Sequence, residues 1–256
     1  MRTQPRVSGT GLASFAVQAG FVVTVYAFWF SASELQIISP LALPHPGAVW
    51  SEFTKLLASG DFLPDLMLTL SEVAIAFTAA AIAGLLLGYV IARSPALVRI
   101  FEPLLSSLNS IPAVMFVPLF VLLFGLGMSS KVVMGLLTGF FPVVLNTIAG
   151  FSNIEPIYLK AARSMGASQN QLFRRVLLPS ALPVILTGLR MGFIVAFLSI
   201  LGAEAIGSYA GLGHRIVENA ETLAIPRMFA FIAFAIIVAA MINLLLNALE
   251  RSGRWQ

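Results

Sequence analysis

Several long apolar runs constrain this chain more than any other feature. The first, residues 11–30, reads GLASFAVQAGFVVTVYAFWF, and the others lie near residues 70–92, 111–127, 130–151, 181–206 and 226–249. A helix needs about 20 apolar residues to cross a bilayer. Barrel strands span about 10 residues with alternating polarity, so these runs are too long to be strands. The runs predict an all-α, polytopic membrane protein with about six transmembrane helices.

The composition agrees with a membrane protein. Of 256 residues, 59% are apolar and only 10% are charged. Cysteine is absent and the two histidines, His45 and His214, are far apart, which argues against disulfides and metal sites. The basic residues are scattered beside the apolar runs, which argues against nucleic-acid binding. We expect residues 1–256 to form a single transmembrane domain.

The basic residues also predict the orientation, because cytoplasmic loops are enriched in Lys and Arg. The first run follows Arg2 and Arg6 and exceeds the 7 to 15 apolar residues of a signal peptide, so we expect an uncleaved anchor. With the N-terminus inside, the segments near 93–101 and 152–180 and the C-terminus are also inside. The segments 31–65 and 207–225 are then outside. Most of the basic residues fall on the inner side: Arg2, Arg6, Arg93, Arg99, Lys160, Arg163, Arg174, Arg175, Arg251 and Arg254.

The longest polar interruption in the second half is residues 158–183, YLKAARSMGASQNQLFRRVLLPSALP. Gly166 suits the end of one helix. Ser168 followed by Gln171 matches a capping box at the start of the next. Pro179 and Pro183 are expected to end that helix and turn the chain back to the membrane. By periodicity alone, this segment is either a docking surface or an ordinary amphipathic interfacial loop.

Within it, KAARSMGASQNQLFRRVLLP resembles the EAA loop of bacterial ABC importer permeases. Lys160 replaces the Glu that usually opens this motif. The resemblance implies that a coupling loop at about 152–180 contacts the ATPase through Lys160, Ala161, Ala162, Arg163, Gly166, Ala167, Leu178 and Pro179.

Other segments are similar to the nitrate, sulfonate and taurine branch of that family. They are SLNSIPAVMFVPLFVLLFGLGMSSK, GFFPVVLNTIAGF, GLRMGFIVAF, LGAEAIGSYAGLG and LERSGRWQ. Glu72 stands where the branch usually has a basic residue, which suggests an altered helix face towards other subunits.

The resemblance implies a type I ABC importer permease in the bacterial inner membrane that moves a small anionic solute, similar to nitrate, a sulfonate or taurine, by alternating access. It implies four kinds of contact: a second permease copy, two ATP-binding cassette ATPase subunits, an extracytoplasmic substrate-binding protein and the lipid bilayer. The chain has no G-x-x-x-x-G-K-[ST] phosphate loop, so ATP and Mg²⁺ are expected on the partner ATPase, with no cofactor and no catalytic residue in this chain.

Candidate pore or gate residues are polar, aromatic and glycine residues in or beside the spans: Phe140, Phe141, Asn146, Glu204, Gly211 and Gly213. Helix–helix hydrogen bonding is the alternative role for Asn146, as it is for Thr147 and Asn109. Structural pairing is the alternative for Glu204.

Two other function classes fit less well. An ion-coupled secondary transporter would normally show mid-membrane carboxylates or broken helices, and neither is evident in the sequence. An intramembrane enzyme would need a motif such as H-E-x-x-H or G-x-S-x-G, and neither occurs.

Overall fold

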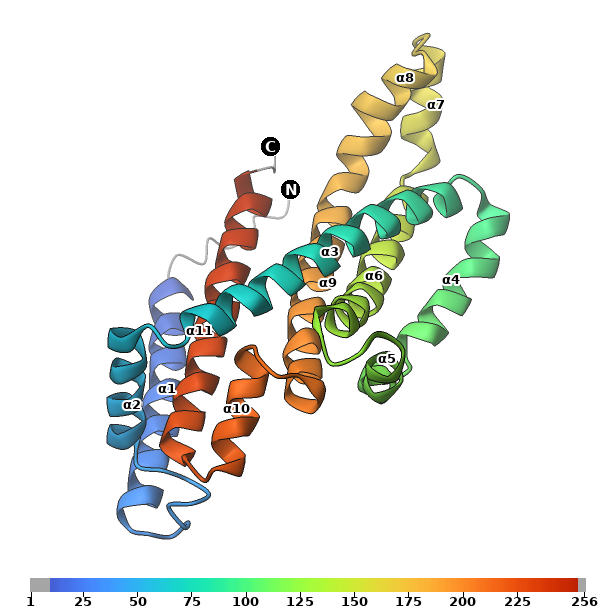
Figure 1. Ribbon diagram of the computed structural model, residues 1–256. Coiled ribbons are helices and arrows are strands. Elements are labelled where there is room, and N and C mark those ends of the chain that lie inside the picture. The colour runs from blue at the N-terminus through green and yellow to red at the C-terminus, as the bar shows by residue number, and fades with distance from the viewer. Residues whose placement is uncertain (1–9, 253–256) are drawn as a thin grey trace.

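The computed structural model describes residues 10–252, and every regular element in that range is a helix (Figure 1). The all-α prediction is therefore confirmed. In chain order the elements are α1 (Thr10–Glu34), α2 (Pro46–Ser59), α3 (Leu63–Ala92), α4 (Pro95–Asn109), η1 (Ala113–Phe116), α5 (Val117–Phe124), α6 (Met128–Ser152), α7 (Pro156–Ser164), α8 (Gln169–Leu172), η2 (Phe173–Leu177), α9 (Leu178–Gly207), α10 (Leu212–Glu221) and α11 (Ile225–Ser252).

Five of the helices between residues 10 and 252 are long and apolar enough to cross a membrane. They are α1, α3, α6, the continuous helix that contains α9, and α11. A sixth span is obtained when α4 and the η1–α5 helix, which meet at a bend, are taken together. The expected six spans are thus reached only with this bent pair.

The prediction that residues 111–127 form a span by themselves is wrong. The helical piece there, Ala113–Phe124, is too short to cross alone and is bent by 76° relative to the preceding helix, Pro95–Asn109. Pro112 explains the break, because proline donates no backbone hydrogen bond and disfavours helical geometry at the residue before it. Broken helices, which the sequence did not make evident, therefore do occur.

The centre of the molecule is built from α3, α6 and α9. Gly84 and Gly88 of α3 lie directly against side chains of α6, and Gly192 of α9 lies against the Gly139 carbonyl. A Cβ at Gly192 would lie 2.7 Å from that carbonyl oxygen, so only glycine permits this approach. Close backbone packing through small residues is the usual way in which membrane helices associate.

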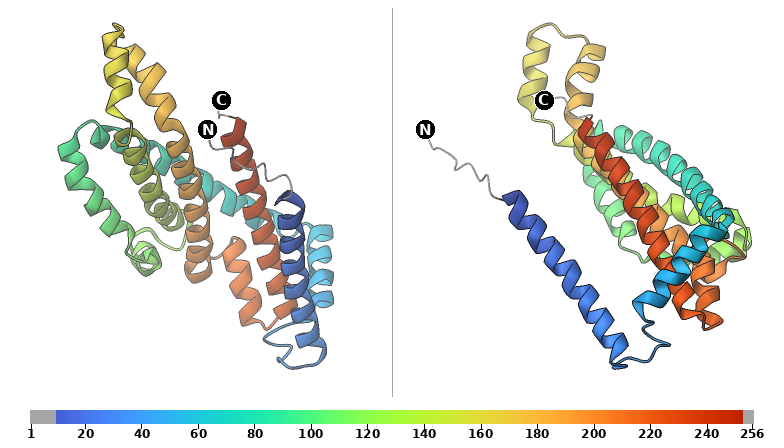
Figure 2. Two further views of the ribbon diagram at one scale, coloured as in Figure 1. Left: turned by 180° about the vertical axis from the view of Figure 1, so that it is seen from behind. Right: turned by 90° about the vertical axis from the view of Figure 1, so that its left-hand side faces the viewer.

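The first span lies at the edge of this bundle. Figure 2 shows α1 leaning away from the other helices, and Val17 and Phe21 are more than two-thirds exposed. Its C-terminal end is attached near α2, where the Trp29 indole donates to the Pro44 carbonyl over 2.9 Å. A short helix, α2, precedes the second span.

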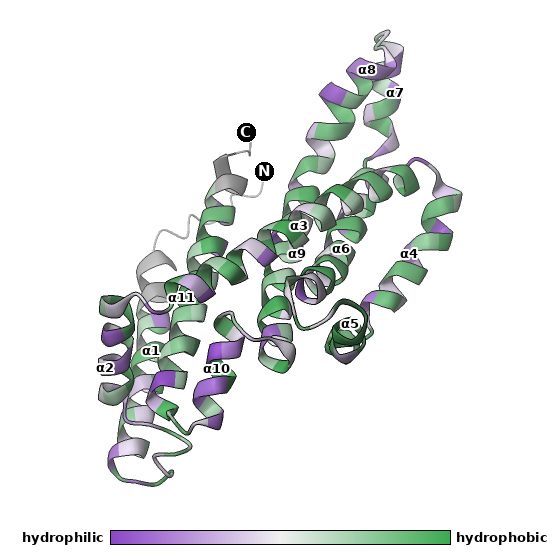
Figure 3. Ribbon diagram, viewed as in Figure 1, coloured by the Kyte–Doolittle hydropathy of each residue, from purple (hydrophilic) through white to green (hydrophobic). Residues whose placement is uncertain are grey.

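The segment after α6 forms a hairpin that projects beyond the central helices (Figure 1). Figure 3 shows polar residues concentrated on this hairpin and on α2 and α10, while the long helices are mostly apolar. The prediction that the helix ends at Pro179 is wrong. The helix continues from α8 through the π-helical η2 into α9, and Pro179 directly follows the π-helical turn, which alters the backbone hydrogen bonds where proline has no N–H to donate. Pro183 lies inside α9.

Candidate functional site

The hairpin between α6 and α9 has the local structure that its sequence predicts. Gly166 follows the end of α7 with a φ of +79°, a left-handed conformation that side chains disfavour. The capping box is present: Ser168 Oγ accepts from the Gln171 amide at 3.3 Å, and Gln171 Oε1 accepts from the Ser168 amide at 2.9 Å. These contacts define a tight turn at the tip of a projecting helical pair.

Most of the residues predicted to couple to the ATPase face outward. Met165, at the tip, is 81% exposed, and no atom lies within 4 Å of a Cβ added to Gly166. Ala162 is different, because it is buried inside the hairpin at 6% exposure. Of the predicted residues, those exposed are Lys160, Ala161, Arg163, Gly166, Leu178 and Pro179, while Ala167 is half-buried.

A second constellation lies where α3 and α9 meet the segment that leads into α10. Glu204 is fully buried, and each of its carboxylate oxygens has a partner. Oε1 accepts from the Thr69 hydroxyl at 2.6 Å, and Oε2 accepts from the Gly213 amide at 2.7 Å. Glu204 therefore joins two long helices to the start of α10.

Asp65 makes the parallel connection one turn before Thr69 on α3. Its Oδ1 accepts from the Gly211 amide at 2.8 Å, and its Oδ2 accepts from Arg215 Nε at 2.7 Å. Hydrogen bonds to Asp65, and secondly to Glu218, raise the pKa of the Arg215 guanidinium above its ordinary value. Arg215 thus stays cationic throughout the physiological range. We call Asp65, Thr69, Glu204, Gly211, Gly213 and Arg215 the outer cluster, because the orientation predicted from the sequence puts this end of the chain outside.

Both glycines of the outer cluster are sterically required. A Cβ at Gly211 would lie 2.3 Å from Glu204 Oε1, and the φ of this residue is +107°. A Cβ at Gly213 would lie 2.1 Å from the Leu201 carbonyl oxygen. The structure therefore brings Glu204, Gly211 and Gly213 together, as the sequence suggested, and α10 replaces the expected outer loop.

Two further ionisable groups are buried near the outer cluster, and their burial was not predicted from the sequence. Glu72 on α3 and Lys131 on α6 are each 1% exposed. Lys131 donates to the carbonyls of Leu126 and Gly127, whereas Glu72 Oε2 is buried without a hydrogen-bond partner among the described residues. Glu72 therefore faces the interior of the chain, and the expectation that it alters a face towards other subunits is wrong. Buried carboxylates, which were not evident in the sequence, are present.

The remaining candidate gate residues are dispersed. Phe140 and Phe141 make an edge-to-face contact with ring centroids 5.5 Å apart, and both pack near the buried Ile148. Asn146 donates to the Pro142 carbonyl of its own helix at 2.8 Å and lies against Gly188 of α9. Phe141 also lines a cavity of about 660 Å³ beside the bend between α4 and η1.

Comparison with known proteins identifies the class of membrane protein to which this architecture belongs. Residues 66–252 match the family model described as "Binding-protein-dependent transport system inner membrane component". The chain belongs to this family. It is a multi-pass inner-membrane permease subunit of an ABC importer, and a separate subunit of the transporter binds and hydrolyses ATP. This assignment replaces the secondary-transporter and enzyme alternatives.

Individual relatives agree with the family. The chain is 33% identical to the taurine transport system permease protein TauC of Escherichia coli, over 91% of this chain and 86% of that protein. It is 30% identical to the putative aliphatic sulfonates transport permease protein SsuC of Bacillus subtilis, over 89% of this chain and 82% of that protein. The fold is similar to an inward-facing structure of the MetNI methionine ABC transporter, with a TM-score of 0.63 and 20% identity over 76% of this chain and 96% of that one.

Proposed function

We propose that this permease imports taurine or another small aliphatic sulfonate. The observation that carries the proposal is the similarity to permeases named for taurine and aliphatic sulfonates, which extends over about nine-tenths of the chain. The named relatives also share most of their own length with this chain. A small anionic or zwitterionic solute is therefore the expected cargo.

In this proposal two copies of the permease enclose the pathway, and two ATPase subunits bind the hairpin at about 152–180. The projecting shape of α7 and α8 and the exposure of Lys160, Ala161 and Arg163 support an external contact. A small residue such as Ala161 allows another protein to approach the helix backbone closely. Movement of the hairpins on ATP binding then tilts α9, which is continuous with α8 through η2.

The outer cluster is proposed to act on the opposite side, at the mouth that receives solute from the binding protein. The hairpin and α10 lie towards opposite ends of α9 (Figure 1), which supports this division. Both termini and the hairpin are cytoplasmic in the proposed orientation, and residues 1–256 act as one transmembrane unit.

The proposal is tested with the complete complex in proteoliposomes. The permease, its ATPase and the binding protein are reconstituted, and uptake of radiolabelled taurine and ethanesulfonate is measured with and without ATP. We expect binding-protein-dependent uptake of at least one of these solutes when ATP is supplied. A complex whose ATPase responds to its binding protein, but which takes up neither solute, would refute the sulfonate assignment.

A further inference from the structure

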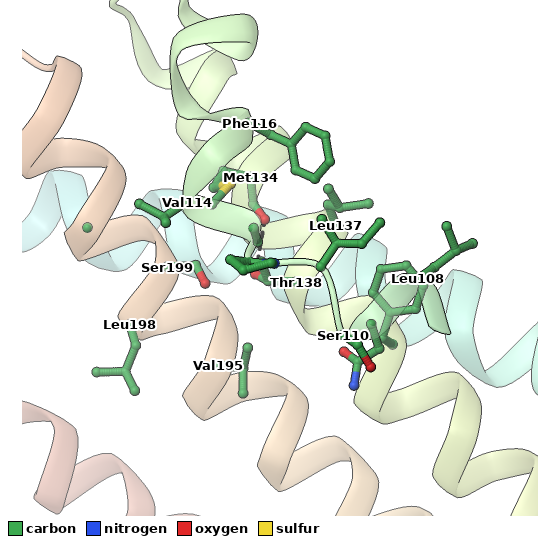
Figure 4. A pocket seen from close by; sticks show the side chains of 16 residues that line it. Leu108, Ser110, Val114, Phe116, Met134, Leu137, Thr138, Val195, Leu198 and Ser199 are labelled. Atoms are coloured by element: carbon green, nitrogen blue, oxygen red, sulfur yellow. Dashed lines mark hydrogen bonds between the residues drawn. The ribbon is translucent and has the colours of Figure 1, made fainter. Parts of the chain in front are cut away.

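The cavity beside the broken span has features of a solute site (Figure 4). Its volume of about 660 Å³ lies within the range of small-molecule sites, which is roughly 300 to 1,000 Å³. Four parts of the chain line it: the end of α4, the break with η1, α6 and α9. Irregular backbone at membrane depth is tolerated where it is buried or lines a water-filled cavity, and the break at Ser110–Pro112 lines this one.

The polar groups in this cavity are neutral, and two of them are unused. The Ser199 hydroxyl and the side-chain amide of Asn109 make no hydrogen bond within residues 10–252. The Thr138 hydroxyl donates to its own helix, at 3.0 Å from the Met134 carbonyl, so it retains acceptor capacity only. The cavity therefore offers free hydrogen-bond donors from α4 and α9.

Charge is missing from the same surface. The described residues that line the cavity include no Asp, Glu, Lys or Arg. Lys131 is one turn before Met134 on α6, but it is 1% exposed and its ammonium group is bonded to the carbonyls of Leu126 and Gly127. The rest of the wall is apolar and includes Leu137 and Leu198.

From these features we infer that the cavity is a transit site for an alkyl-bearing solute whose polar head is held by neutral donors, without an ion pair. This inference deepens the proposed function and rests on it. Ser199 and Asn109 donate to the oxygens of the head, and Leu137 and Leu198 contact the aliphatic part. A solute in transit must bind weakly enough to leave, and a site without a counter-ion meets that requirement.

The inference also predicts a preference. An inorganic anion such as sulfate has no aliphatic part to contact the apolar wall, and its concentrated charge would lie in a cavity without a cation. Desolvating such an ion without a charged partner is costly. An alkanesulfonate gains apolar contact and spreads its charge over three oxygens, so the cavity favours ethanesulfonate over sulfate.

The chain has no cysteine, so one introduced thiol reports on the cavity directly. Val195→Cys, on the α9 wall of the cavity, is placed in the assembled, nucleotide-free complex, and its modification by sulfonatoethyl methanethiosulfonate is timed with increasing ethanesulfonate or with sulfate at equal ionic strength. Ser51→Cys is the matched control, because Ser51 is exposed on α2, far from the cavity in the fold. Both variants must elute like the wild-type complex in size-exclusion chromatography.

We expect ethanesulfonate to slow modification of Val195→Cys by a factor of 1 + [solute]/Kd, about twofold at a concentration equal to Kd, with no effect on Ser51→Cys. Equal protection by sulfate, absence of protection, or a Val195 thiol that does not react would each overturn the inference. Wild-type uptake of ethanesulfonate is measured in parallel. If uptake occurs without protection, this inference alone fails; if the wild type takes up neither taurine nor ethanesulfonate, the proposed function fails first.

Discussion

At the residue scale, the most constrained groups are the buried carboxylates that bind backbone amides. Glu204 and Asp65 accept from the amides of Gly213 and Gly211, which lie in a segment that would otherwise have unpaired buried donors. Asp65 contacts Gly211 and Arg215, which follow it in the chain by 146 and 150 positions. These side chains position the segment that we place at the outer mouth.

The first prediction concerns Glu204. Glu204→Ala removes the acceptor of the buried Gly213 amide, which costs about 1–3 kcal/mol, whereas the Thr69 hydroxyl keeps a second acceptor in the Asp65 carbonyl. We expect a lower Tm of the purified complex and weaker stimulation of its ATPase by the binding protein. Glu221→Ala, at an exposed position at the end of α10, is the control and leaves both unchanged. A Glu204→Ala complex as stable as the wild type would contradict this role.

The second prediction concerns Gly213. Its replacement by alanine puts a Cβ 2.1 Å from the Leu201 carbonyl oxygen, a contact that flexible side chains cannot relieve because the obstacle is backbone. We expect a large loss of correctly folded permease, measured as the monodisperse fraction after extraction. Gly127→Ala is the matched control, since no atom lies within 4 Å of its added Cβ. Normal yield of Gly213→Ala would show that α10 is displaced from this position.

At the scale of elements, the hairpin and the broken span depart from simple helical spans in opposite ways. Prolines at 179 and 183 do not interrupt a helix that runs from α8 to Gly207, whereas Pro112 separates α4 from η1. The difference lies in the hydrogen bonds that precede each proline: η2 has π-helical geometry immediately before Pro179, while the chain before Pro112 leaves the helix. The continuous helix from α8 to α9 can carry a movement of the hairpin along its axis. The broken span between α4 and η1 instead lines the cavity.

The third prediction concerns Gly166 at the hairpin tip. Gly166→Leu forces a bulky residue into a left-handed conformation, which costs about 1–2 kcal/mol, and places that side chain on the surface that we propose binds the ATPase. We expect less taurine imported per ATP hydrolysed. Gly60→Leu is a close match, because Gly60 has a φ of +72°, has no atom within 4 Å of an added Cβ and lies at the end of α2. An equal loss of coupling in both variants would attribute the effect to backbone strain.

At the scale of the whole molecule, the arrangement divides into two ends. The polar hairpin projects at one end of the bundle, and α2 and α10 lie at the other (Figure 3). The distribution of Lys and Arg predicts that the hairpin end is cytoplasmic. In the proposed orientation, coupling to the ATPase and delivery of solute occur on opposite sides of the membrane.

The fourth prediction tests that orientation with single cysteines at Ala48, Ala210 and Ser168. Ala48 and Ser168 are exposed and Ala210 is half-buried. In intact cells, a membrane-impermeant maleimide is expected to label Ala48→Cys and Ala210→Cys but not Ser168→Cys, which reacts only after permeabilisation. Val143→Cys, buried at 1% exposure, is the unreactive control. The reverse labelling pattern would invert the orientation and remove the hairpin from the ATPase side.

Local patterns of apolar, capping and small residues are enough to predict the helical class, most of the spans, the capping box at Ser168 and the family. They also point to Glu204, Gly211 and Gly213. The fold is needed to show that Glu72 and Lys131 are buried, that Thr69 and Asp65 accept from the amides of Leu212 and Gly211 at the start of α10, and that Ser199 and Asn109 share a cavity across a broken span. The physical reason is distance along the chain: such partners lie tens to more than a hundred residues apart, and packing between helices, rather than any local pattern, brings their side chains into contact.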